Sequence, residues 1–283
     1  MRTRYCLALL LVALTALPIL AGCSVNPVTG RRELVLISED QEIAMGKEAA
    51  PTFEKEFGGR VPNETLQAYV NSVGQRVAKV SDRPMPYEYT LVASDVPNAF
   101  ALPGGTIFIT AGLMRAMTNE RQLAAVLGHE TGHVAARHSV HQMQKQMGAQ
   151  VLIEIAGRAG GGEGAAGAAG DVAKVVSSMA LLKYSRNDEY QADDLGIKYA
   201  AQAGYNPWGM VELLTVLDSL HEKDPGRFDE LFQTHPLSGN RIERARTTVQ
   251  EDPAYKGRYS LAAPDPNQGT FQRMQALLGK ATK

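Results

Sequence analysis

The segment His129-Glu130-Thr131-Gly132-His133 constrains the fold because it places two histidines four residues apart. It lies ten residues into a predicted helix over about 119–147, for which Asn119 is a suitable N-cap. Residues four apart on a helix are offset by about 40° around the axis and roughly 6 Å along it. Both imidazoles therefore project from one face and can bind one metal ion. Glu130 lies beside that face, where its carboxylate can act as a general base.

A third ligand is predicted on another helix, over about 186–203. Glu189 is expected to bind the metal. One turn later, Asp193 is expected to accept a hydrogen bond from His129 and so fix its tautomer. The small residue Gly196 shares this face, which predicts close approach of a neighbouring helix. The alternative interpretation is a solvated acidic face.

The remaining histidines differ in their surroundings. Thr234-His235-Pro236 marks a turn, and Arg241 follows it. His235 is expected to stabilise a transition-state oxyanion or to cover the metal in a resting state, and the alternative is an ordinary turn histidine. On a continuous helix His138 and His141 would project away from the ligands, so both are expected on the surface.

The periodicity of the chain predicts mostly helices and little sheet. Alternation predicts a strand over 87–93 and a hairpin in which 98–102 and 106–110 flank Pro103-Gly104-Gly105. Two helices are expected to begin near Ser38 and Asn63. Further helices are predicted over 119–147, 171–182, 186–203, 207–221 and 238–250, with a final turn or two near 271–278. We therefore expect a mainly α fold, formally α+β, with a small β-sheet or hairpin beside the helix of the two ligand histidines.

The N-terminal residues 1–22 are typical of a signal peptide, with an early positive charge and a short apolar run. Leu20-Ala21-Gly22-Cys23 resembles a bacterial lipobox, which implies cleavage before Cys23 and lipidation of that residue. By the same resemblance, Ser24 favours the outer membrane over the inner one. The alternative is an uncleaved membrane anchor.

Composition limits the other possibilities. Hydrophobic residues make up 44% of the 283 residues and charged residues 21%, and the net charge of −1 argues against nucleic-acid binding. Cys6 and Cys23 are the two cysteines, so any metal in the mature body must be held by His, Asp and Glu. The Gly/Ala-rich segment 157–170 is expected to be a flexible loop or, alternatively, a flap near the metal.

Taken together, the motifs resemble the HtpX-like and CAAX-prenyl-protease-like zinc metallopeptidases, within the gluzincin group. The matching segments are Asn26-Pro27-Val28-Thr29-Gly30, Asn98 to Gly105, His129 to His133, Glu189 to Asp193, and Thr234-His235-Pro236. The resemblance implies a helical zincin-type domain with one Zn²⁺ per chain, bound by His129, His133 and Glu189. It also implies that Glu130 is the catalytic base and that His235 acts at the active site.

Within the resemblance, the lipobox is similar to that of periplasmic lipoprotein members. The expected organisation is a lipidated tether over 23–37, a zinc metallopeptidase domain over 38–250 and a C-terminal tail with a short helix over 251–283. The chain is expected to lack the helical repeat arm that some members carry. The Gly/Ala-rich segment stands where some integral-membrane members have spanning helices.

Two further sets of residues complete the predicted site. The strand that carries Asn98, Phe100, Ala101 and Leu102 is expected to bind substrate by pairing with an extended peptide. Arg241 is expected to contact the ligand side chains, rather than the metal, and to hold them in position.

The expected function is that of a membrane-tethered zinc endopeptidase that cleaves unfolded or misassembled envelope proteins on the periplasmic side. The outer-membrane assembly machinery is a candidate partner. The alternative is a tethered assembly or chaperone-like factor with a latent or structural zinc site. A zinc hydrolase of small molecules or cell wall is a weaker third interpretation, because aromatic residues make up only 6% of the chain, with one Trp.

Overall fold

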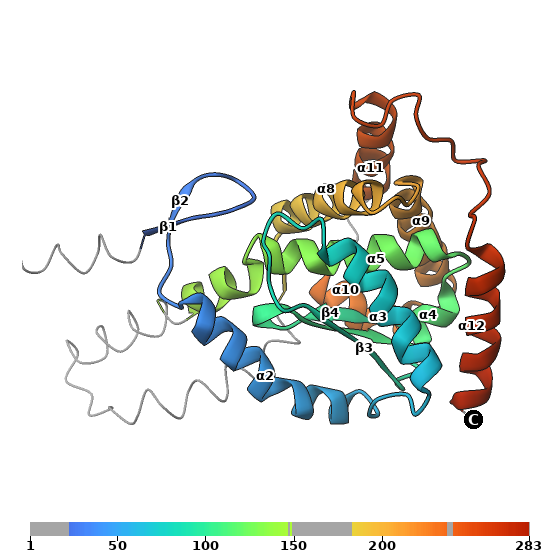
Figure 1. The fold of residues 1–283 in the computed structure, drawn as a ribbon, viewed down its shortest axis with the longest axis horizontal. Helices are drawn as coiled ribbons and strands as arrows, with labels where there is room; N and C mark the ends of the chain where they lie inside the picture. The colour runs from blue at the N-terminus through green and yellow to red at the C-terminus, as the bar shows by residue number, and fades with distance from the viewer. Residues whose placement is uncertain (1–22, 147, 149–182, 237–239, 283) are drawn as a thin grey trace, which may run out of the picture.

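The computed structural model describes residues 23–146, 148, 183–236 and 240–282. In these residues, a small hairpin of β1 (Cys23–Val25) and β2 (Arg32–Leu34) precedes helices arranged around a three-stranded sheet (Figure 1). The further elements are α2 (Glu39–Glu56), α3 (Glu64–Ala78), β3 (Glu88–Val92), β4 (Ala99–Ala101), the 3₁₀ turn η1 (Pro103–Gly105), β5 (Thr106–Thr110), α4 (Ala111–Ala116), α5 (Glu120–Ala135), α8 (Arg186–Gln202), α9 (Trp208–Lys223), α10 (Pro225–Thr234), α11 (Asn240–Glu251) and α12 (Gln268–Ala281). The predicted mainly α fold with small sheets is confirmed.

Helix α5 is the central element of the fold, and every residue from Glu120 to Ala135 is buried. In Figure 1 it passes through the middle of the molecule, with α8 and α9 on one side and α3 and the sheet on the other. Its start is fixed locally, because the Asn119 side chain accepts a hydrogen bond from the backbone N–H of Gln122. The metal-binding motif therefore lies in the interior rather than on a surface helix.

The three-stranded sheet has the order β3-β5-β4, with β3 parallel and β4 antiparallel to β5. The predicted hairpin around Pro103-Gly104-Gly105 is confirmed. Gly104 and Gly105 have φ angles of 79° and 99°, a region that glycine adopts without strain. β4 lies at the edge of the sheet and packs against α5, which brings the predicted substrate strand next to the metal-binding helix.

The backbones of α5 and α8 approach closely at glycines. A Cβ atom on Gly128 would lie 3.1 Å from Cα of Gly196, and one on Gly196 would lie 3.0 Å from the backbone nitrogen of His129. Both distances are shorter than the optimum of about 3.5–4.0 Å between non-bonded heavy atoms. The close helix approach expected from Gly196 is therefore present, and its partner is the helix that carries the two histidines.

The residues that follow α11 form a strap, residues 261–282, across the start of α5. Asp265 accepts a hydrogen bond from the backbone N–H of Arg121 (2.9 Å), and the Asn267 amide donates to the Glu120 carboxylate (2.8 Å). The strap ends in α12, which is longer than the predicted final turn or two near 271–278. Its apolar side chains Phe271 and Leu278 are buried in the main core. Tertiary packing therefore stabilises a longer helix than the sequence pattern predicted.

One prediction about the helices was wrong, and two short helices, α4 and α10, were missed. The helix over 119–147 is not continuous: α5 ends at Ala135, Arg137 has a left-handed φ of 62°, and helical structure resumes at His138. A left-handed residue interrupts the helical hydrogen-bond ladder, and no glycine or proline marks this break in the sequence.

Several predictions fall outside the described residues, namely the signal peptide over 1–22, the Gly/Ala-rich segment 157–170 and the helix over 171–182. Among the helices that the structure does describe, none combines the length and apolar character needed to cross a membrane. Cys23 pairs with Leu34 in the N-terminal hairpin. Asn26 anchors this hairpin by donating to the Ala136 carbonyl (3.3 Å) just beyond α5.

We expect Gly196→Val to lower the free energy of unfolding by about 1–3 kcal/mol, because the added side chain forces α5 and α8 apart. The matched control is Gly279→Val in α12, where a Cβ meets nothing within 4 Å. Urea unfolding of the two variants tests the prediction. An equal loss in both would mean that the close approach of α5 and α8 is not what makes Gly196 necessary.

Candidate metal centre

Three predicted ligands from two helices converge in the interior. Nε2 of His129 lies 3.0 Å from Nε2 of His133, and a carboxylate oxygen of Glu189 lies 3.4 Å from the latter nitrogen. The other Glu189 oxygen lies 3.6 Å from Nε2 of His129. Ligands that surround Zn²⁺ tetrahedrally at about 2.0–2.1 Å are separated by about 3.3–3.4 Å. The spacing of the three side chains therefore fits a single metal ion.

His235 brings a fourth donor atom to the same point. Its Nδ1 lies 3.3 Å from Nε2 of His129 and 3.0 Å from Oε1 of Glu189. Ligand atoms of His129, His133, Glu189 and His235 all lie within 4.8 Å of one another, and all four residues are buried. A set of imidazole nitrogens and one carboxylate oxygen matches the ligand preference of zinc.

If both rings donate from Nδ1, the hydrogen bonds behind the two histidines leave a place for a cation between them. Nδ1 of His129 lies 3.0 Å from Oδ1 of Asp193, and Nδ1 of His133 lies 2.8 Å from Nδ1 of His138. A neutral imidazole that donates from Nδ1 has a lone pair on Nε2. Two such lone pairs at 3.0 Å repel each other unless a positive charge lies between them.

Asp193 and Arg241 occupy the supporting positions predicted for them. The Arg241 guanidinium donates to both Asp193 oxygens, at 2.8 and 2.7 Å, and pairs with Glu189 at 2.6 Å. Burial by itself raises the pKa of the Glu189 carboxyl. The charges of His235 and Arg241 outweigh this effect and hold its pKa well below the usual value. Glu189 is thus kept ionised, as a metal ligand must be.

Glu130 occupies a different environment from the ligand carboxylate. It is buried, and its Oε2 has no hydrogen-bond partner among the described residues. Burial raises its pKa, against the opposing charge of His235, whose Nε2 lies 3.7 Å from Oε1. A carboxylate with a raised pKa and a free oxygen is suited to accept and return a proton.

Two side chains around His133 were missed or misplaced from the sequence. The Tyr184 ring stacks on the His133 ring, with centroids 3.9 Å apart. His138, expected on the surface, is instead buried and contacts His133 directly. The expectation assumed a continuous helix, and the break at Arg137 turns His138 back toward the ligand. His141 is partly exposed, and it pairs with Glu33.

The predicted substrate strand lies beside the centre, although its side chains have other partners. Phe100 packs against Phe108, with ring centroids 5.2 Å apart, and Ala101 and Leu102 are buried. The Asn98 amide donates to Glu230 of α10 at 3.0 Å. In an antiparallel pair, alternate residues direct their backbone groups toward and away from the partner strand. A peptide at this edge would therefore bind through the backbone groups of β4 rather than through its side chains.

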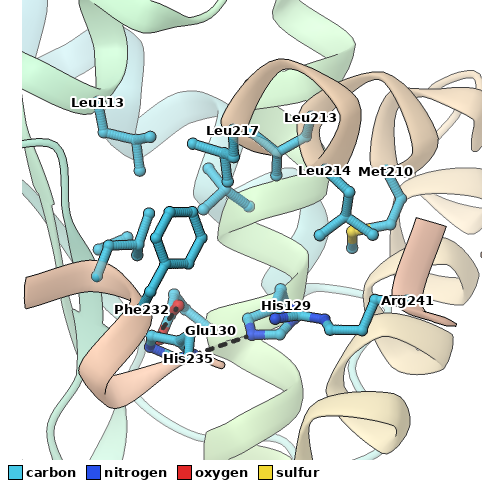
Figure 2. A pocket seen from close by; sticks show the side chains of 13 residues that line it. Leu113, His129, Glu130, Met210, Leu213, Leu214, Leu217, Phe232, His235 and Arg241 are labelled. Carbon is cyan, nitrogen blue, oxygen red and sulfur yellow. Dashed lines mark hydrogen bonds and ion pairs between the residues drawn. The ribbon is translucent and has the colours of Figure 1, made fainter. Parts of the chain in front are cut away.

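A cavity opens next to the metal-binding residues (Figure 2). Its apolar wall comes mainly from α9 and α10, including Leu213, Leu217 and Phe232. Its polar end is formed by Glu130, His235 and other charged or metal-binding side chains. The arrangement places a buried base and a metal site at one end of a space suited to an apolar side chain.

Comparison with known proteins supports this chemistry. Residues 64–249, which include all four candidate ligands, match peptidase family M48. The chain is 29% identical over 242 residues to the beta-barrel assembly-enhancing protease of Yersinia pestis, covering 80% of this chain and 47% of the relative. It is 29% identical over 229 residues to the mitochondrial metalloendopeptidase OMA1 of Schizosaccharomyces pombe, covering 80% of this chain and 66% of the relative. It is also 31% identical over 187 residues to the metalloprotease LoiP of Escherichia coli, covering 66% and 70%. The chain thus spans about half the length of the first of these relatives.

We expect Asp193→Asn to weaken zinc binding about 10–100-fold, because it removes the charged acceptor that holds His129. Competition with a chelating dye measures the dissociation constant. The control is Asp194→Asn, since the neighbouring carboxylate is partly exposed and pairs with Arg244 instead. Comparable zinc affinity in the two variants would contradict the assigned role of Asp193.

Proposed function

The chain belongs to peptidase family M48, whose members are zinc metallopeptidases, and we propose that it is a tethered zinc endopeptidase that cleaves unfolded or misassembled envelope proteins. The observation that carries this proposal is the position of Glu130. A structural zinc site needs only ligands, whereas here a buried carboxylate with an unpartnered oxygen lies beside them at the end of a cavity. That arrangement is the one expected of a hydrolytic site.

In this proposal each side chain has a distinct role. His129, His133 and Glu189 hold the ion, and bound zinc supplies a Lewis acid that activates water and polarises a carbonyl. Glu130 takes a proton from the attacking water and returns it to the nitrogen of the leaving amine. Asp193 and Arg241 keep His129 and Glu189 in position. His235 is placed to donate a hydrogen bond to the oxyanion when it is not itself beside the ligands.

The substrate class follows from the neighbourhood of the site. An extended peptide can add through backbone hydrogen bonds to the outer edge of β4, which pairs with no other strand among the residues that the structure describes, and this requires an unfolded segment. The apolar wall of the cavity suits an apolar side chain next to the cleaved bond. Folded proteins bury such segments, so a protease of this kind selects misassembled chains. The Asn98 side chain, which donates to Glu230 at 3.0 Å, ties the start of this strand to α10.

A second candidate function is favoured by one observation. Nδ1 of His235 lies at the position of a fourth ligand, 3.0 Å from Glu189 and 3.3 Å from His129. Four protein ligands are typical of structural zinc sites. The chain would then be a tethered assembly factor whose zinc site is latent or structural.

We expect Glu130→Gln to retain zinc and lose peptidase activity, because the amide cannot accept the proton. His133→Ala is expected to lose both. Casein cleavage and metal analysis of the purified proteins measure these effects, with the exposed Glu222→Gln as the control. Casein cleavage by Glu130→Gln at the wild-type rate would rule out the assigned base.

The same Glu130→Gln variant separates the two candidate functions in a growth assay that requires the protein. An endopeptidase fails to complement when its base is removed. An assembly factor with a structural zinc site still complements, and that result would favour the second candidate.

For the membrane tether, we expect Cys23→Ser to move the protein from the membrane fraction to the soluble fraction, because the substitution removes the site of lipidation. Fractionation of cell envelopes followed by immunoblotting measures the change. Sucrose-gradient separation of the two membranes locates the wild-type protein, for which we propose the outer membrane and possible contact with its assembly machinery. A Cys23→Ser protein that stays with the membranes would show that something other than this lipid holds it there.

A further inference from the structure

His138 connects the zinc ligand His133 to helix α8. Its Nδ1 lies 2.8 Å from Nδ1 of His133, and its Nε2 lies 2.9 Å from the side-chain oxygen of Gln191. We propose that His138 is a positioning residue: it accepts a hydrogen bond from His133 and thereby fixes the tautomer and ring orientation in which His133 binds zinc. The inference rests on the proposed role of His133 as a ligand.

Only one placement of protons satisfies this chain of contacts. His133 binds the metal through a lone pair on Nε2, so its proton is on Nδ1. Nδ1 of His138 must then be the acceptor, which leaves the proton of His138 on Nε2. That proton points at Gln191 Oε1, a carbonyl oxygen that can only accept. Each donor then meets one acceptor, and the order depends on Gln191 presenting its oxygen rather than its NH2 group to His138.

The backbone is bent to bring His138 to this position. Along an unbroken helix, a residue five positions after His133 would lie about 140° around the axis. The left-handed conformation of Arg137, with φ of 62°, breaks the helix and directs His138 back. A non-glycine residue in this region carries a conformational cost of about 1–2 kcal/mol, so surrounding contacts must hold it.

Those contacts come from a buried charged cluster at the end of α5. The Arg137 guanidinium donates to the Ile37 carbonyl at 2.8 Å and pairs with Glu42 at 3.0 Å. Arg83 binds the same Glu42 carboxylate at 2.8 Å and donates to the Val134 carbonyl at 3.1 Å. The cluster thus secures both the last turn of α5 and the residue that breaks it.

The two histidine ligands are therefore held by different chemistry. Asp193, an anion paired with Arg241, holds His129. An imidazole hydrogen-bonded to the Gln191 amide holds His133, with the Asp188 carboxylate further away, 3.9 Å from Nε2 of His138. Gln191 and Asp193 both lie on α8, as does the ligand Glu189, so a single helix fixes the orientation of every ligand that α5 supplies.

The test uses a pair of substitutions with nearly equal shape. His138→Asn can place its carbonyl oxygen where Nδ1 of histidine lies, whereas His138→Leu fills similar space without an acceptor. We expect His138→Leu to weaken zinc binding about 10–100-fold, and His138→Asn to stay close to wild type. Chelator competition measures affinity, and the visible spectrum of the Co²⁺-loaded protein reports the geometry of the ligands. His141→Leu, on the same segment, is the control.

Each outcome decides a separate point. Equal zinc affinity in His138→Leu and His138→Asn, whether strong or weak, would overturn the inference, because packing alone would then account for His138. If His138→Leu does not fold, the comparison is made at Gln191, the hydrogen-bond partner of His138: Gln191→Leu removes the acceptor and Gln191→Glu keeps it. Equal zinc affinity in these two variants would also overturn the inference. A wild-type protein that binds no zinc would instead refute the proposed function, so the two failures are distinguishable.

Discussion

The separation between α5 and α8 is the constraint on which the rest of the structure depends. Glu189 reaches the two imidazoles because Gly128 and Gly196 let the backbones meet without intervening side chains. With that distance set, α8 also delivers Asp193 to His129 and Gln191 to His138. The close packing of α5 against α8 is therefore what brings the side chains of the metal site together. The sheet packs against α5, α9 packs against both helices, and the C-terminal strap covers the start of α5.

The second requirement is charge balance, because the ionised side chains of the site are buried. Glu189 and Asp193 have depressed pKa values and are ionised, and Arg241 is the buried guanidinium that contacts both. Glu130 adds a third carboxyl group, whose pKa burial raises. One guanidinium does not balance these acidic groups, and His235 responds with a raised pKa, driven by Glu189 and Glu130 against the effect of burial. A divalent cation at the centre supplies the missing positive charge, which explains how so many acidic groups are tolerated inside.

Local signals identified most of the helices and the candidate ligands that the fold brings together, because caps and residue spacing are local properties. Asn119 caps the first ligand helix as expected, Ser185 caps the second, and the four-residue spacing of His129 and His133 needed no tertiary information. His138 was misplaced because the break at Arg137 is maintained by Glu42, almost a hundred residues earlier in the chain. Tyr184 and α10 were missed for a similar reason, since each is defined by what it packs against. The sequence left the role of His235 open between a turn and the site, and only the fold brings it to the ligands.

The strap over the start of α5 consists of residues that are synthesised long after the helix that they contact. The Glu120 carboxylate is satisfied in part by Asn267, and the first-turn N–H of Arg121 by Asp265. These partners emerge from the ribosome more than 140 positions after the helix they complete. Until then, the N–H of Arg121 can bond only to water, whereas the Glu120 carboxylate can already accept hydrogen bonds from Tyr69, Arg76 and Tyr205. A chain that stops before Asp265 therefore lacks both of these contacts, and the first turn of α5 is held only by its Asn119 cap and by the other partners of Glu120.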